Sequence, residues 1–179
     1  MVNNTKMSYL WQGFNSIEEY EMTEQELTDI FKQFGARDPE GWAASEIEEG
    51  IPQLARFLFL KGAWEGVVPD NDDWIDHVMS RYDPKESGPY SGMLHSIKEM
   101  VDAGVSKKAI TEFARCVGGE MIFNISYLMS DPSAVEGNEY VNWGLFITDE
   151  EGYPVKELEG LYESVLDTDP TGREMCPRK

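Results

Sequence analysis

The sequence predicts a mainly α-helical, single-domain protein. Five or six helices surround a central helix, and a β-hairpin and a tail follow. Apolar residues recur at steps of three and four between Ser106 and Ser130, which is the period of a helix with one apolar side. After Asp131, β-branched and aromatic residues become frequent, which favours strands. The length of 179 residues suits one domain. We expect the helical part at about 16–130, the hairpin at about 139–157 and the tail at 158–179.

Five helix starts precede the central helix. Thr23 begins a capping box, in which a Glu three residues later returns the hydrogen bond of the capping side chain. Asp38 stands before a proline, which fits the first position of a helix. Pro52 and Asp72 mark two further starts, and a fifth helix is expected from about Pro89 to residue 103. These helices are expected to pack on the central one.

The central helix is predicted from Ser106, a capping residue, to the Asp-Pro pair at 131–132, which ends it. Its apolar stripe is expected to face the core. We therefore expect Phe113→Ala and Leu128→Ala each to cost roughly 3–5 kcal/mol. The glycine pair at 118–119 indicates close packing by a neighbour, or a kink. The stripe consists of Ile110, Phe113, Val117, Met121, Ile125 and Leu128.

The β-hairpin is predicted from two apolar segments that flank a turn. Residues 140–147 form the first strand, Asp149 to Gly152 form the turn, and Pro154 holds the second strand at a sheet edge. The tail that follows contains a short apolar helix candidate around Leu161 and Val165.

The formal net charge is −19, from 34 acidic and 15 basic residues that are spread along the chain. A surface of this charge repels nucleic acid and anionic membranes, and it speeds encounter with basic proteins. The same charge also serves solubility alone. We expect a protein partner of basic character, no nucleic acid and no membrane.

The sequence favours a cytoplasmic location. It has no apolar run near 18 residues, and its first 14 residues lack the apolar segment of a signal peptide. Cys116 and Cys176 are far apart and form no CxxC motif, which is typical of the reducing cytosol.

Glu120 is the candidate catalytic residue, with Asn124 one helical turn later. On a regular helix both lie in the middle of the apolar stripe, where a carboxylate must be paired or neutral. One interpretation is a poised acid or base in a pocket. The other is a satisfied core network that an arginine or histidine from another helix completes.

Asp73 and His77 are the candidate metal ligands, four residues apart on one helical face. Two ligands do not make a site, and a solvated helix face is the preferred interpretation of this pair.

A second acidic motif imitates a calcium-binding EF-hand loop over its first six positions, at Asp167, Asp169, Thr171 and Gly172. Arg178 stands where the twelfth position must supply a bidentate glutamate. The sequence also lacks GxGxxG, P-loop, HExxH and GxSxG motifs. We therefore expect no metal and no cofactor.

The C-terminal segment GLYESVLDTDPTGRE, at residues 160–174, resembles the tail of a group of short bacterial cytosolic proteins with no assigned function. The resemblance implies a bacterial cytosolic protein. It supplies no activity and no catalytic residues.

The predicted function is that of a non-catalytic acidic protein that binds another macromolecule, with an immunity-type inhibitor of a basic toxin as one version. The alternative is an enzyme or small-ligand binder with a pocket around Glu120. The sequence does not indicate an oligomeric state. Aromatic anchors for binding are available among five tryptophans, namely Trp11, Trp42, Trp64, Trp74 and Trp143.

Overall fold

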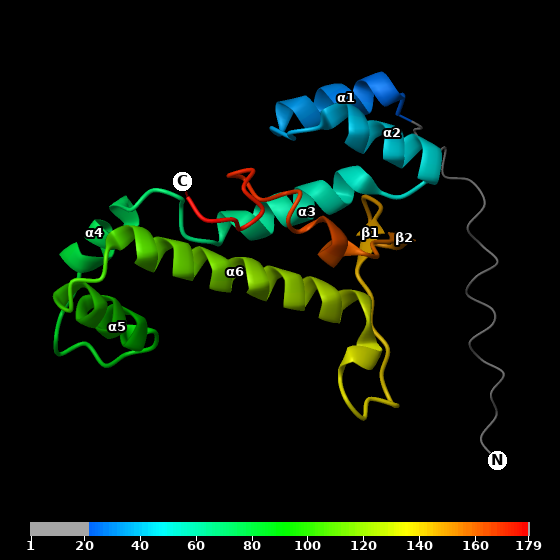
Figure 1. Ribbon diagram of the computed structural model, residues 1–179. Helices are drawn as coiled ribbons and strands as arrows, with labels where there is room; N and C mark the ends of the chain where they lie inside the picture. The colour runs from blue at the N-terminus through cyan, green and yellow to red at the C-terminus, as the bar shows by residue number, and fades with distance from the viewer. Residues whose placement is uncertain (1–21, 179) are drawn as a thin grey trace, which may run out of the picture.

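The computed structural model describes residues 22–178, and Trp11 and the first residues of the predicted helical part, from about 16, lie outside them (Figure 1). Within that range the protein is mainly helical, with a two-stranded hairpin near the C-terminus, which confirms the predicted fold class. No helix in this range is long and apolar enough to cross a membrane. The α-helices are α1 (Glu24–Gln33), α2 (Pro39–Glu49), α3 (Gln53–Glu65), α4 (Asp73–Ser80), α5 (Ser91–Asp102) and α6 (Lys107–Ser130).

The helix starts agree with the capping signals in the sequence. Thr23 and Glu26 form the expected capping box, in which each side chain accepts a hydrogen bond from the backbone N–H of the other residue. Asp38 Oδ1 accepts the N–H of Gly41 at 3.1 Å, and Ser106 Oγ accepts the N–H of Ala109 at 3.2 Å. These bonds satisfy helix N–H groups that have no partner inside the helix.

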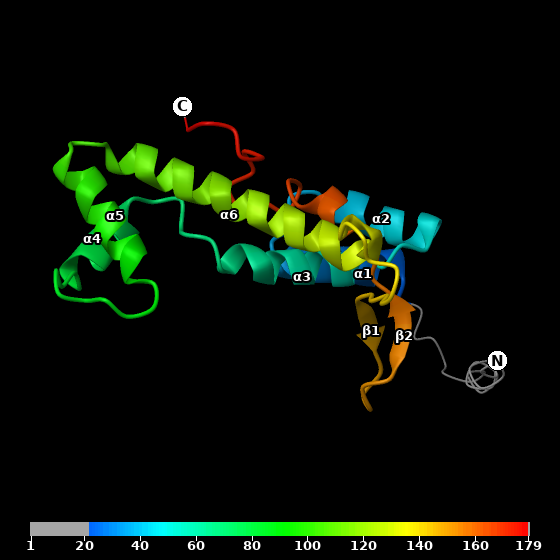
Figure 2. The same ribbon diagram turned by 90° about the horizontal axis from the view of Figure 1, so that it is seen from below.

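Helices α3 and α6 form the long axis of the molecule and run side by side in opposite directions (Figures 1 and 2). Helices α1 and α2 pack on each other and on α3, whereas α4 and α5 pack at the N-terminal end of α6. Within residues 22–178 the buried apolar residues therefore form three separate clusters. One cluster joins α1, α2 and α3 through Leu27, Phe31, Ala43 and Phe57. The second joins α4, α5 and α6 through Ile75, Val78, Ile97 and Ile110. The third joins α3 to the tail through Leu60, Trp64, Leu158, Leu161 and Val165.

The prediction that the apolar stripe of α6 is buried is wrong for most of its length. Phe113 is 67% exposed and Leu128 is 39% exposed, so neither is a core residue. The side of α6 that faces α3 and the tail is instead mostly polar or small, with Arg115, Gly119 and Ser126 buried on it and Ile122 as its half-buried apolar residue. The tail can approach there because glycine lacks a side chain and because Arg115 forms an ion pair with the tail.

The hairpin pairs β1 (Phe146–Thr148) with β2 (Pro154–Glu157) in antiparallel register, with an irregularity after Ile147. The Asp149 carboxylate accepts the N–H of Tyr153 at 2.8 Å and closes the turn. The first strand is shorter than predicted because its pairing begins only at Phe146, and residues 140–145 belong to no regular element.

The tail returns from the hairpin along α3 and α6 (Figure 1). It contains one short 3₁₀-helix, η2 (Leu161–Ser164). A first 3₁₀-helix, η1 (Pro132–Ala134), follows α6 earlier in the chain. Leu161, Val165 and Asp169 are buried, so the tail is an integral part of the fold.

Candidate functional site

Glu120 and Asn124 lie on the exposed side of α6, so the predicted burial of Glu120 is wrong. Glu120 and Asn124 lie on the same side of α6 as the apolar stripe. That stripe faces solvent, so the two side chains do as well. No described residue forms an ion pair with Glu120; Arg56, an arginine on another helix, binds the Gly160 carbonyl and Glu163 instead. Neither of the two cavities described below includes Glu120. The enzyme alternative therefore loses the buried carboxylate on which it depends.

Asp73 and His77 are both exposed on α4. The backbone N–H of Asp73 donates to Asn71 Oδ1 at 3.1 Å, in the turn that leads into the helix. In residues 22–178 no three His, Cys, Asp or Glu side chains are arranged to hold a metal ion. Cys116 and Cys176 are both exposed, and neither forms a disulfide.

The exposed apolar stripe of α6 is the most extensive unpartnered apolar feature on this helix. We call it the outer face, and it consists of Phe113, Val117, Met121, Ile125 and Leu128, all of which are exposed. Glu120 is the only charged residue between Cys116 and Ser130. Large contiguous exposed apolar faces commonly mark interaction sites.

The outer face lies between two projections. Helices α4 and α5 extend from the N-terminal end of α6, and residues 131–145 extend from its C-terminal end, both away from α3 (Figure 1). The Trp143 indole N–H donates to the Leu128 carbonyl at 2.7 Å and fixes the second projection to α6. Exposed carboxylates without an ion pair to a described residue are present on both, at Glu99 and at Glu136 and Glu139, whereas Asp102 on α5 is paired with Lys98.

A buried ion pair holds the tail against the inner side of α6. Arg115 Nη2 lies 3.1 Å from Asp169 Oδ1, and the two side chains are 4% and 0% exposed. Asp169 also accepts the N–H and hydroxyl of Thr171, at 3.0 and 2.8 Å, and the N–H of Met175 at 3.3 Å. Burial raises the pKa of Asp169, but these hydrogen bonds and the charge of Arg115 together hold the pKa below its ordinary value.

Two arginines of the tail complete the attachment. Arg173 pairs with Asp70, and Arg178 Nη2 lies 2.7 Å from Asp72 Oδ1. Both arginines also reach Glu112 Oε1, at 3.4 and 3.3 Å. The Arg178 side chain lowers the pKa of Asp72, and the Arg178 backbone N–H is the main cause of the lowered pKa of Glu112. The end of the chain is thus tied to α6 and to the loop before α4.

The ion pairs and hydrogen bonds of the basic side chains affect the charge that the surface presents. Of the 34 acidic residues, nine form ion pairs with described residues. The cations are largely occupied within the fold, and the remaining surface is therefore strongly acidic. Five of the six arginines, all in the described part, bind other segments of the chain: Arg37, Arg56, Arg115, Arg173 and Arg178.

Sequence reasoning did not identify the partnership of Arg115 with Asp169, which are 54 positions apart. One signal pointed toward it. The glycine pair at 118–119 indicated close packing, and a Cβ at Gly119 would lie 2.6 Å from Met175 Sδ in the tail. The glycine pair therefore marks where the tail crosses α6, although not which residues bind there.

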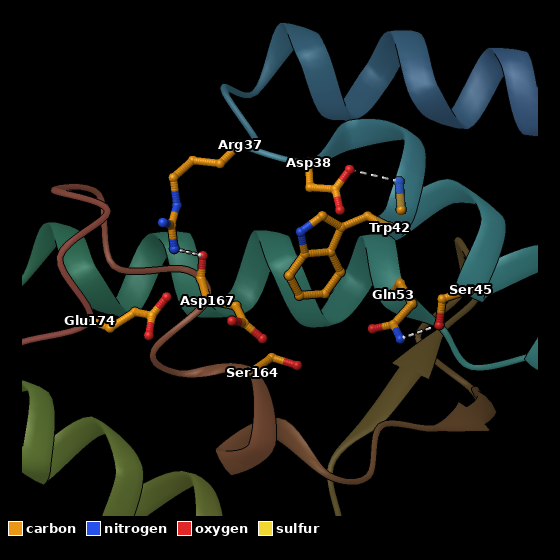
Figure 3. Close-up of a pocket in the computed structure, with 9 residues that line it drawn as sticks. Arg37, Asp38, Trp42, Ser45, Gln53, Ser164, Asp167 and Glu174 are labelled. Atoms are coloured by element: carbon orange, nitrogen blue, oxygen red, sulfur yellow. Dashed lines mark hydrogen bonds between the residues drawn. The ribbon is translucent and has the colours of Figure 1, made fainter.

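Two cavities lie beside the tail. One, of about 620 Å³, is bordered by the start of α3, the end of α6 and the second strand. The other, of about 460 Å³, is bordered by α2, the start of α3 and the tail (Figure 3). The second cavity is lined by Trp42 and by several carboxylates. Unlike the first, it also contains a buried acceptor without a hydrogen-bond partner, Gln53 Oε1.

Comparisons of the chain with protein-family models, with curated proteins and with solved structures gave no match. The function is therefore inferred from the chain's own residues and their geometry.

Proposed function

We propose that this protein is a non-catalytic binding protein whose outer face holds a basic amphipathic helix of a partner protein. An immunity-type inhibitor that covers a basic toxin is one form of this function. The observation that carries the proposal is an exposed apolar face on α6, without a positive charge, in a chain of net charge −19. The proposal keeps the predicted bacterial cytosolic setting.

The dimensions of the outer face suit a helix. From Phe113 to Leu128 it extends about 22 Å along α6, at about 1.5 Å per residue. A partner helix of similar length with apolar residues at three- and four-residue steps can match it, as helices bound in apolar grooves do. Apolar anchors supply most of the affinity in such interfaces.

The charges around the outer face favour a partner helix of positive charge. Glu120 lies within the face, and exposed carboxylates lie on both projections that flank it. Lysine or arginine residues beside the apolar stripe of a partner helix would meet these carboxylates. Rim charges of this kind raise the association rate and reject like-charged partners more than they add affinity.

A second copy of the chain is a poorer occupant. If two outer faces packed around a two-fold axis at the middle of the stripe, each Glu120 would approach its own counterpart. Each copy also carries a net charge of −19. Both effects oppose self-association.

The test uses the full chain and a labelled peptide of about 18 residues that forms an amphipathic helix. The peptide has a leucine stripe flanked by lysines, and a second peptide has the same stripe flanked by glutamates. Fluorescence anisotropy at near-physiological salt should show binding of the lysine peptide and no binding of the glutamate peptide.

A double variant, Phe113→Ser with Met121→Ser, should weaken binding of the lysine peptide by about tenfold or more, the effect of losing about 1.4 kcal/mol. The matched control is Ile47→Ser, because Ile47 on α2 is 49% exposed and lies away from the outer face. This control should bind as the unchanged chain does. Equal binding by the double variant, or equal binding of both peptides, would contradict the proposal. A dimer in sedimentation that the double variant abolishes would assign the face to a second copy instead.

A further inference from the structure

The cavity between α2, α3 and the tail has the properties of a ligand site that is separate from the outer face. Its volume of about 460 Å³ falls in the range of small-molecule sites. It is bordered by α2 and the start of α3, which are close in the sequence, and by the tail, which follows more than 100 residues later, so its polar groups lie on three elements of the fold (Figure 3). It is lined by Arg37, Asp38, Gly41, Trp42, Ser45, Gln53, Ser164, Asp167 and Glu174.

A buried acceptor in this cavity has no donor. Gln53 is 8% exposed, and its Nε2 donates to Ser45 Oγ at 2.8 Å. Its Oε1 is buried and accepts no hydrogen bond from any residue that the structure describes. Figure 3 shows Oε1 turned away from Ser45 toward Ser164 and the interior of the cavity. Buried acceptors in folded proteins are normally paired, so this atom calls for a ligand that carries an N–H or O–H donor.

The charges of the cavity favour a positive ligand. Three carboxylates, from Asp38, Asp167 and Glu174, line it together with one guanidinium group. That group belongs to Arg37, which already donates to the Gly172 and Asp167 carbonyls at 3.1 and 2.9 Å. The carboxylates of Asp167 and Glu174 accept no hydrogen bond from described residues, so both remain available to a ligand.

An aromatic wall adds a second preference. The ring of Trp42 borders the cavity (Figure 3). It also packs against the rings of Phe31 and Phe57. A tryptophan face attracts organic cations and covers methylene groups. A metal ion fits this chemistry less well, because the described residues hold no converging set of three metal-binding side chains.

We propose that the cavity binds an alkylammonium group, with Gln53 Oε1 and the Asp167 carboxylate as acceptors and Trp42 as the wall for the alkyl chain. The group can belong to a free polyamine or to a lysine side chain of a protein, since the recognised chemistry is the same. This site goes beyond the proposed function and does not depend on it, because the outer face contributes no residue to the cavity.

Isothermal titration calorimetry on the full chain tests this proposal with three probes. The first probe is spermidine. The second is a short blocked peptide with one lysine. The third is the same peptide with norleucine in place of lysine, which keeps the alkyl chain and removes the charge. Binding of either amine probe with no binding of the norleucine peptide is expected, and the amine that binds identifies the source of the group. Absence of binding by both amines at about 1 mM would overturn the proposal, because binding weaker than this does not indicate a specific site.

Three variants separate the cavity from general attraction to an acidic protein. Gln53→Met removes the buried acceptor at similar size, and Asp167→Asn removes one exposed carboxylate. Each should weaken amine binding by about tenfold, and circular dichroism should show that both variants keep their helices. Glu150→Gln removes the same charge from the hairpin turn, away from the cavity, and should leave binding unchanged. Equal weakening by Glu150→Gln and Asp167→Asn would overturn the site. The outer-face double variant should bind the amine normally, so failure of the proposed function and failure of this site are distinguishable.

Discussion

Replacement of Asp169 by asparagine tests how strongly the tail stabilises the protein. The carboxylate lies between Arg115 on α6 and the tail backbone, with Oδ1 bound to Arg115 and Thr171 N–H. Oδ2 accepts the Thr171 hydroxyl and the Met175 N–H. Asparagine keeps the shape and one oxygen, but it removes the charge and places an NH₂ group opposite two donors.

The expected loss of unfolding free energy follows from these contacts. Loss of one partner from a buried ion pair costs about 3–5 kcal/mol, because the other charge stays buried. Asp70 Oδ1 lies 3.6 Å from Arg115 Nε and partly replaces the lost charge. We therefore expect a value near the lower end, about 3 kcal/mol. This is a large part of the 5–15 kcal/mol by which natural domains are stable.

Urea unfolding followed by circular dichroism gives the measurement, and limited proteolysis reports release of the tail. Asp167→Asn is the matched control, because it makes the same chemical change two residues earlier on an exposed side chain. It should change the unfolding free energy by less than about 0.5 kcal/mol. A loss below about 1 kcal/mol for Asp169→Asn, with the tail still protected, would refute the conclusion that this ion pair anchors the tail.

Three further predictions concern the faces of α6 and the acid limit of stability. Gly119→Ala should destabilise by about 1–3 kcal/mol, because its methyl carbon would lie 2.6 Å from a sulfur atom of the tail. Gly62→Ala on α3, where nothing lies within 4 Å, should instead stabilise by about 0.5–1 kcal/mol, and urea unfolding of both separates close approach from helix propensity. Phe113→Ala should cost less than about 1 kcal/mol in the same assay, whereas Leu60→Ala at a fully buried position should cost about 2–5 kcal/mol, and equal losses would return Phe113 to the core. The pKa of Asp169 in the folded state lies below the ordinary 3.8, so the stability that its carboxylate contributes is present above pH 3.8 and is lost as the pH falls through the folded pKa. The difference in unfolding free energy between the unchanged chain and Asp169→Asn should therefore shrink in that acid range. A difference that stays constant there would contradict the lowered pKa of Asp169.

The features that the sequence predicted are those that short segments decide. The capping box at Thr23 needs a glutamate only three residues away, and Asp38 caps the residues that directly follow it. The turn at Asp149 likewise depends on neighbouring residues, so the hairpin was predictable although its first strand is shorter than expected. Local hydrogen bonds of this kind do not depend on how the helices pack.

The features that the sequence did not predict depend on which side of a helix is covered. Periodicity shows that α6 has one apolar side, but it does not show what lies against that side. The tail takes the opposite side, where Arg115 can pair with Asp169 and Gly119 permits close approach. Glu120 then faces solvent for the same reason that Phe113 does. The cavity beside Trp42 was also unpredictable, because the tail that forms one of its walls is more than 100 residues from the helices that form the other.

The tail connects the proposed amine site to the stability of the fold, which yields a last prediction. Asp167 and Glu174 line the cavity, and Asp169 between them anchors the tail to α6. An amine that binds these carboxylates only when the tail is in place must stabilise the folded state by mass action, by about 2.7 kcal/mol at a concentration 100 times its Kd. That gain is comparable with the loss of about 3 kcal/mol expected for Asp169→Asn. Saturating spermidine or lysine peptide, whichever binds, should therefore restore most of the urea midpoint of Asp169→Asn, and the norleucine peptide should not. A midpoint that the amine leaves unchanged in both the variant and the unchanged chain would show that the amine does not bind at the tail.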